Sequence, residues 1–236
     1  MQPPISISAI ASVSAFGAST EKVWQRYRDG VPLFSEFEGT LISKVASEIE
    51  TEIQQIIDSN DRYKNVDRTV LLAILAAKKG WEKLDVRSAN LGVNIGSSRG
   101  ATGLFEKYHQ DFQQHGKVSP FTSPTTTLGN ISSWVAQELG TTGVAIDHSV
   151  TCSKAMHAML NGIAWLQAEM ADGFLVGGSE AALTPFTIAQ MKALKLYSTS
   201  RHRMACESMR FQKKENTMVL GEGAAVAYLE RGISER

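Results

Sequence analysis

Apolar, strand-like segments alternate with helix-forming segments along this chain, and this alternation constrains its fold most strongly. The strand-like segments are residues 5–10, 89–98, 143–151, 173–178 and 217–230. The last of these predicts either one strand or a pair of strands. The helical segments are residues 20–30, 66–84, 104–116, 131–140, 153–171 and 187–195. Such alternation predicts an α/β layered domain with a largely buried sheet.

Two of the predicted helices are strongly apolar. Segment 66–84 carries a broad apolar face, made by Val66, Val70, Leu71, Ile74, Leu75 and Trp81. Segment 155–171 (AMHAMLNGIAWLQAEMA) is apolar nearly all round, so we expect it to run through the interior of the protein. By contrast, the Pro/Ser/Thr-rich segment 117–130 predicts an ordered loop.

The composition excludes several classes of protein. The chain has 236 residues, which suit one large α/β domain or two small ones. Its 24 basic residues balance 24 acidic residues, which gives no electrostatic case for a nucleic-acid partner or a membrane surface. No apolar run approaches the roughly 18 residues of a membrane span, and the first residues lack the basic start of a signal peptide. These features predict a soluble, cytoplasmic protein.

Cys152 lies at the predicted junction between strand 143–151 and helix 153–171. The first N–H groups of a helix have no partner within the helix, and its dipole is positive there. A thiol at this place loses its proton more easily, and the same N–H groups can hold an oxyanion during acyl transfer. Cys152 is therefore a candidate nucleophile. The alternative is a small buried hydrophobic residue, which a free cysteine usually is. The only other cysteine is Cys206, and neither has the spacing of a zinc site.

The sequence does not provide Cys152 with a convincing general base. His157 is nearest, but helical geometry places it about 140° around the axis from Cys152. This position favours a histidine whose hydrogen bonds are satisfied in the core. The remaining histidines lie in polar or basic segments or before the turn: His109, His115, His148 and His202.

Four segments resemble the first half of the β-ketoacyl synthases, which have a thiolase-like fold. VTCSKAMHA (150–158) resembles the nucleophile motif of that family and places the nucleophile at Cys152. Segment 176–199 is similar to the Gly-Gly-x-Glu segment, with Glu180, Pro185 and the pair Ser198 and Thr199 in register. Segment 8–30 resembles the opening strand, glycine turn and first helix, and segment 219–230 resembles the closing strands. The four segments occur in the family's order across nearly the whole chain.

The resemblance implies both a fold and a reaction. The fold would be a layered α-β-α half with a mixed five-stranded sheet, with residues 1–236 as the N-terminal domain. An acyl chain would move from an acyl carrier protein to Cys152. A decarboxylated malonyl group on a second carrier would then attack the thioester, as in fatty acid or polyketide biosynthesis. The backbone N–H of Cys152 would help to form the oxyanion hole. No cofactor or metal is implied.

The resemblance also implies a dimer. The partner would be a second copy or another ketosynthase-like subunit, and the loop Thr125–Asn130 would border the partner's pocket.

The chain departs from the family pattern in several places. The family's two catalytic histidines lie in H-G-T-G-T and N-x-x-H-x-x-G motifs of the second half, and neither motif occurs here. We therefore expect half of a longer enzyme, or a chain that needs a separate partner, and no complete reaction from this chain alone. Lys154 replaces a small residue, and its ammonium would either favour a thiolate or, as the simpler expectation, point to solvent. Gln212, Glu215 and Asn216 stand where Asp, Arg and Asp are usual, which suggests an unusual acyl substrate.

Other interpretations stay open or are discarded. Glu180 is expected to support the structure through backbone hydrogen bonds rather than to act as an acid or base. GSSRGATG (96–103) lacks the ending and spacing of a phosphate-binding loop. The chain can also be a non-catalytic partner subunit of the chain-length-factor kind, although such subunits generally lack the cysteine. A thiol hydrolase acting alone would lack a base. The preferred acyl chain and the pathway are not predicted.

Overall fold

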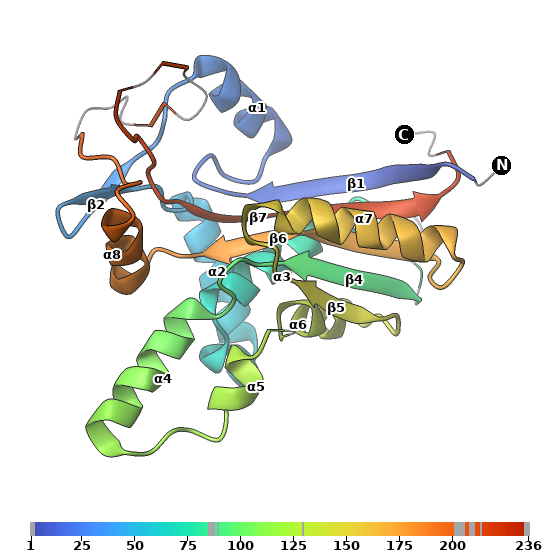
Figure 1. Ribbon diagram of the computed structural model, residues 1–236. Helices are drawn as coiled ribbons and strands as arrows, with labels where there is room; N and C mark the ends of the chain where they lie inside the picture. The colour runs from blue at the N-terminus through green and yellow to red at the C-terminus, as the bar shows by residue number, and fades with distance from the viewer. Residues whose placement is uncertain are drawn as a thin grey trace.

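A mixed five-stranded sheet forms the centre of the molecule (Figure 1). The computed structural model describes residues 3–84, 88, 90–128, 130–200, 206–207, 211–212 and 214–233. The strands are β1 (Ile5–Val13), β4 (Leu91–Gly96), β5 (Ala145–His148), β6 (Gly173–Ala181) and β7 (Glu222–Arg231). Their order is β1-β7-β6-β4-β5, in which β7 is antiparallel to both neighbours and β6, β4 and β5 are parallel. The predicted α/β class and mixed five-stranded sheet are confirmed.

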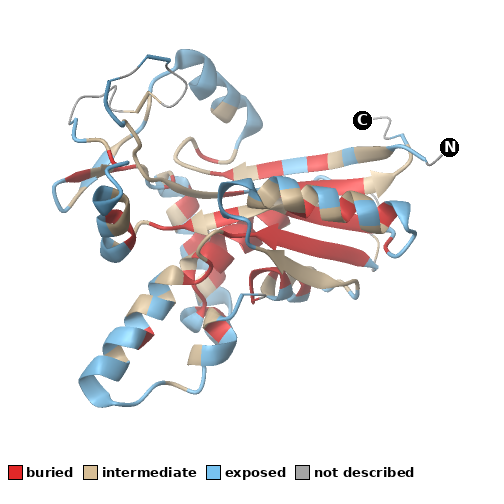
Figure 2. Cartoon of the chain, viewed as in Figure 1, coloured by how far each residue is buried: buried red, intermediate tan, exposed pale blue. Residues whose placement is uncertain are grey.

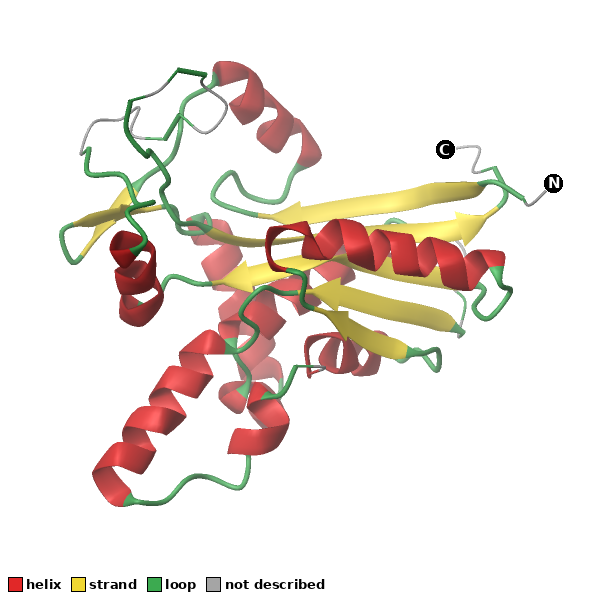
Figure 3. Ribbon diagram, in the orientation of Figure 1, coloured by secondary structure: helices red, strands yellow, loops and turns green. Residues whose placement is uncertain are grey.

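Helices cover both faces of this sheet (Figure 3). The α-helices of the described residues are α1 (Thr20–Asp29), α2 (Ser47–Ser59), α3 (Arg68–Trp81), α4 (Thr102–His115), α5 (Thr122–Thr126), α6 (Asn130–Leu139), α7 (Lys154–Gln167) and α8 (Pro185–Ala193). Helix α7 lies on one face, and α2, α3 and α6 lie behind the sheet on the other (Figure 1). Within the described ranges, no helix is both long enough and apolar enough to cross a bilayer.

Local sequence signals set several helix ends. The Ser19 side chain accepts a hydrogen bond from the Lys22 N–H at the start of α1, and Gly30 ends that helix at a left-handed φ of 64°. The side chain of Asp67 accepts from the Thr69 N–H at 2.8 Å at the start of α3. These capping groups explain why both helices begin where the sequence predicts.

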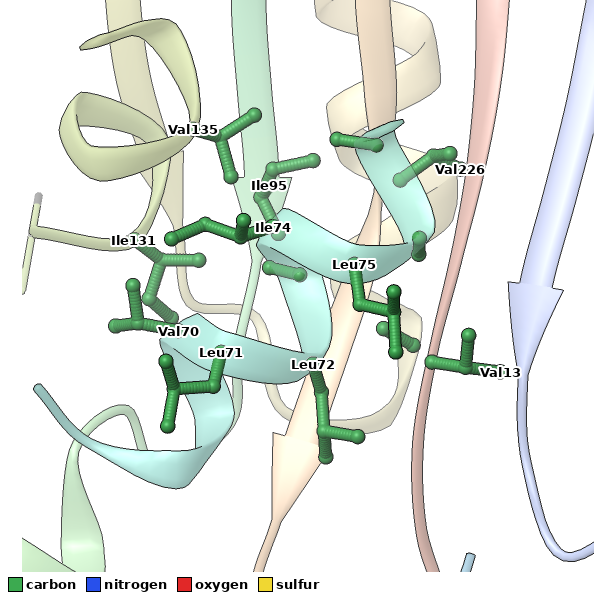
Figure 4. Packing of buried hydrophobic residues seen from close by; sticks show 14 of the residues in the cluster. Val13, Val70, Leu71, Leu72, Ile74, Leu75, Ile95, Ile131, Val135 and Val226 are labelled. Carbon is green, nitrogen blue, oxygen red and sulfur yellow. The ribbon is translucent and has the colours of Figure 1, made fainter. Parts of the chain in front are cut away.

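Helix α3 lies at the centre of the main core. Ten of its 14 residues are buried, and it packs against β1, β6, β7 and α6. Figure 4 shows Val70 and Ile74 beside Ile131, and Leu75 toward Val13. The Tyr228 hydroxyl donates to the Ala77 carbonyl at 3.0 Å, so the one polar atom of this ring is satisfied inside the core. The apolar face predicted for 66–84 is therefore the face that the sheet and α6 bury.

The prediction that the 155–171 helix runs through the interior is wrong. The helix ends at Gln167, and its buried residues are only Ala158, Gly162 and Leu166. Met156 and Leu160 are 64% and 61% exposed. The sheet covers one side of α7 and nothing among the described residues covers the other (Figure 2). Apolar composition alone does not decide burial, because burial also needs a second packing partner.

Three further differences concern secondary structure. Segment 31–65 contains a hairpin, β2 (Ser35–Phe37) with β3 (Thr40–Ile42), and helix α2, none of which was predicted. Segment 117–130 contains the short helix α5 rather than loop alone, and three threonine hydroxyls there donate to carbonyls one turn back. The last strand-like segment forms one strand, β7.

Candidate functional site

Cys152 lies in a short turn between the sheet and α7. Strand β5 ends at His148, a 3₁₀ turn spans Thr151–Ser153, and α7 begins at Lys154. The thiol is free and exposed. No side chain caps α7 at Ser153, so the first N–H groups of the helix have no side-chain acceptor there. The structure thus places Cys152 at the predicted strand–helix junction and does not bury it.

The residue before the cysteine has an unusual backbone. Thr151 has a φ of 46°, in the left-handed region that β-branched residues rarely adopt. Such a conformation costs on the order of 1–3 kcal/mol and persists where surrounding contacts hold it. Its carbonyl accepts from the Lys154 N–H and from the Ser98 hydroxyl, the latter at 2.9 Å. The turn that presents Cys152 is therefore held from two directions.

The end of β4 lies directly under the start of α7. A Cβ on Gly96 would approach the Lys154 backbone to 2.9 Å, closer than real Cβ atoms come. Glycine is required here because the strand and the helix start touch through their backbones. The loop that follows Gly96 is thereby brought to the Thr151–Ser153 turn.

Glu180, at the end of β6, binds this loop. Its carboxylate accepts from the N–H groups of Ser98 and Arg99, at 3.0 and 3.2 Å, and from the Ser97 hydroxyl at 3.1 Å. The backbone hydrogen bonds expected of Glu180 are present, and its supporting role stays a prediction. The segment set aside as a phosphate loop thus binds a carboxylate of the protein itself.

Lys154 does not point to solvent, so the simpler expectation for this residue is wrong. Its ammonium forms an ion pair with Glu180, and the two side chains are only 14% and 22% exposed. The ammonium also donates to the Ser98 hydroxyl at 3.0 Å. Burial lowers the pKa of Lys154, and the attraction between its ammonium and Cys152 opposes that shift. Lys154, Glu180 and Ser98 therefore form one polar cluster next to the cysteine.

No described histidine hydrogen-bonds to Cys152. Nδ1 of His157 lies 3.1 Å from the Ser153 carbonyl, and its ring stacks on His148 with centroids 6.1 Å apart. Nδ1 of His148 is 2.9 Å from the Asn161 amide. His157 thus has partners, as predicted, but it is half-buried rather than part of the core. His109 and His115 are exposed, as expected for solvated side chains, and His202 lies outside the described residues.

The remaining positions that the sequence singled out are not part of the Lys154–Glu180–Ser98 cluster. Pro185 is the first residue of α8. Gln212, Glu215 and Asn216 are exposed, and the Asn216 amide donates to the Lys195 carbonyl at 2.6 Å. The Asn130 amide donates to the Thr125 carbonyl, which closes the 125–130 segment on itself. That this segment borders a partner's pocket stays a prediction.

Comparison with known proteins decides the family. The family model described as the β-ketoacyl synthase N-terminal domain matches residues 2–233. The chain belongs to the β-ketoacyl synthase family. Among curated relatives of this synthase domain, 3-oxoacyl-[acyl-carrier-protein] synthase 2 of Coxiella burnetii is 26% identical over 235 residues. The match covers 95% of the chain and 57% of the relative, so the chain spans little more than half the relative's length.

Solved structures confirm the thiolase-like architecture of the synthase domain. One is a type II polyketide synthase acyl carrier protein in complex with its ketosynthase bound to the hexaketide, with a TM-score of 0.80 at 18% identity. Another is the ishigamide ketosynthase/chain length factor, with a TM-score of 0.80 at 17% identity. Each match covers 98% of this chain and 59% of the other chain. At this identity the likeness shows the fold.

Proposed function

We propose that this chain is the acyl-accepting half of a β-ketoacyl synthase and that Cys152 is its nucleophile. The observation that carries this proposal is the exposed thiol on a left-handed turn at the uncapped start of α7. In the first step, the Cys152 thiolate attacks the carbonyl of an acyl thioester on an acyl carrier protein. A new sulfur–carbon bond forms, and the carrier's thiolate leaves with the electron pair of the broken bond.

The backbone supports this step as well. The Cys152 N–H has no acceptor among the described residues, so it is available to the oxyanion that forms on the attacked carbonyl. The condensation step requires a malonyl group to lose carbon dioxide, which the family's histidine motifs assist. Because neither motif occurs in this sequence, the chain takes up the acyl group but does not complete the condensation alone.

An uncovered apolar groove supports the view that a second half completes the site. Met156 on α7, Ile10 on β1 and Trp24 on α1 line it, and these side chains are 64%, 55% and 62% exposed. Exposed apolar area of this kind marks a surface that packs against another element. The relatives have a further part that this chain does not match, since the match covers only 57% of their length. We propose that the remainder of a longer enzyme, or a separate ketosynthase-like subunit, packs on this groove.

A cerulenin-type electrophile tests the proposal. The protein, Cys152→Ser and Cys206→Ser are each treated, and the modified peptides are identified by mass spectrometry. We expect modification of Cys152 in the wild-type protein and in Cys206→Ser, and none in Cys152→Ser. Equal modification of Cys206 would overturn the assignment. In that case a non-catalytic partner subunit would be the better interpretation.

A further inference from the structure

Lys154 connects three segments of the site that are far apart in the sequence. It is the first residue of α7, two positions after Cys152. Its ammonium contacts Glu180 at the end of β6 and donates to the Ser98 hydroxyl in the loop after β4. The same Ser98 hydroxyl donates to the Thr151 carbonyl at 2.9 Å. A lysine at this position therefore participates in holding the backbone that presents the sulfur.

We propose that Lys154 is a positioning residue of the Cys152 site, which locks the Thr151 turn through Ser98 and places a fixed positive charge beside the sulfur. The inference rests on the proposed function, because it gives Lys154 a role only if Cys152 is the reacting atom. The family motif has a small residue at the position of Lys154, so the motif does not supply this role.

The locking part follows from the hydrogen bonds. The Ser98 hydroxyl has one proton, which it donates to the Thr151 carbonyl, and a second group that donates to the Ser98 oxygen favours this orientation. The Lys154 ammonium is that donor, at 3.0 Å. Without it, the rotation of the hydroxyl is less constrained, and one of the two restraints on the left-handed Thr151 is weakened.

The charge part follows from geometry and electrostatics. The ammonium is largely withdrawn from water, so it is screened less than a surface lysine. Among the charged groups, Glu180 pairs with it directly and orients it, and a Cys152 thiolate attracts it. An ion pair can also be purely structural: Arg68, the first residue of α3, pairs with Glu222 at 2.7 Å on the other face of the sheet. The experiment must therefore separate a charge effect at the sulfur from general support of the fold.

Two alkylating reagents of similar size and different charge distinguish a charge effect at the sulfur from general support of the fold. In each reaction the Cys152 thiolate forms a sulfur–carbon bond and iodide leaves, but iodoacetate is an anion and iodoacetamide is neutral. Rates at Cys152 are measured for the wild type, Lys154→Met, Lys154→Arg and Glu180→Gln in a Cys206→Ser background. Circular dichroism and urea unfolding report whether each variant is folded.

We expect Lys154→Met to lower the ratio of the iodoacetate rate to the iodoacetamide rate by about fivefold, the effect of one nearby charge in a solvated site. Lys154→Arg should keep the ratio within about twofold, because it keeps the charge. Glu180→Gln should raise it, because the cation loses its counter-charge. An unchanged ratio in Lys154→Met would overturn the charge part of the inference, and an unchanged iodoacetamide rate would overturn the locking part. If wild-type Cys152 reacts with neither reagent, the proposed function itself fails.

Discussion

Helices α3 and α7 lie on opposite faces of one sheet, each has 14 residues, and both are apolar, yet they differ sharply in burial. Ten residues of α3 are buried and only three of α7. Helix α3 packs against the sheet and also against α2 and α6, whereas among the described elements α7 packs on the sheet and the turn before it alone (Figure 2). The contrast teaches that α3 stabilises the core, while α7 follows Cys152 and leaves an apolar surface exposed among the described residues.

The two helices also begin in the same way. Each starts with a basic residue that pairs with a glutamate on a neighbouring strand, Arg68 with Glu222 and Lys154 with Glu180. Glu222 is the more buried glutamate, with 3% of its side chain exposed. One pair fixes a helix in the core and the other fixes a helix start at the candidate site.

The largest expected loss of stability comes from a substitution at a buried residue of α3. Leu72→Ala removes a side chain with no exposed surface, which should lower the free energy of unfolding by about 2–5 kcal/mol. Urea unfolding followed by circular dichroism measures it. A loss below about 0.5 kcal/mol, the usual range for surface positions, would show that α3 is not the centre of the core.

A pH-dependent contribution to the stability of the fold is expected at Asp147 on β5, on the face that α6 covers. Burial raises its pKa to about 6, partly offset by hydrogen bonds from the Ser132 N–H. Above pH 6 the folded state carries a buried charge that the unfolded state hydrates, so ionisation destabilises the fold. As pH falls toward 4 this penalty disappears, because the folded state gains the proton first.

Asp147→Asn should therefore be more stable than the wild type at pH 7, by about 1–3 kcal/mol, with the difference vanishing near pH 4. Unfolding in urea at both pH values tests this expectation. The same difference at both values, or a less stable variant at pH 7, would contradict the assigned cause.

A comparable change in stability is expected at Glu222, the buried glutamate of β7 that pairs with Arg68 of α3. Glu222→Gln leaves Arg68 with Glu50 as its remaining ionic partner and should cost about 1–3 kcal/mol. Thermal unfolding of Glu222→Gln beside Glu50→Gln measures it, since Glu50 is the more exposed partner of the same arginine. A larger loss from Glu50→Gln would reverse the ranking of the two contacts.

The smallest change in the free energy of unfolding is expected on the outer side of α7, which no described residue covers. Leu160→Ala matches Leu72→Ala chemically, but its side chain is 61% exposed, so the change should stay within about 0.5 kcal/mol. A loss above 2 kcal/mol for this chain alone would mean that the outer face of α7 is packed, and the comparison between the helices would fail.

Much of this architecture is predictable from the sequence. Periodicity located the main strands and helices, and the junction at Cys152 followed from a strand-like segment next to a helical one. Helix α2 was missed although its buried residues Ile49, Ile53 and Ile56 have helical spacing. For this helix the pattern was available in the sequence.

The Lys154–Glu180–Ser98 cluster was not predictable in the same way. Lys154 and Glu180 were each singled out, but they are 26 residues apart, and Ser98 lies 56 residues from Lys154. The parallel pairing of β4 with β6 brings these positions together, and local sequence does not encode that register. Likewise, the exposure of α7 depends on what packs against it and not on its composition.

The central claim is that the Cys152 sulfur accepts an acyl group, and intact-protein mass spectrometry tests it most directly. The chain is incubated with an acyl thioester on an acyl carrier protein, in parallel with Cys152→Ser and Cys206→Ser. The account predicts a mass increase of one acyl group in the wild type and in Cys206→Ser, and no increase in Cys152→Ser. No increase in any of the three, or an increase that persists in Cys152→Ser, would contradict it.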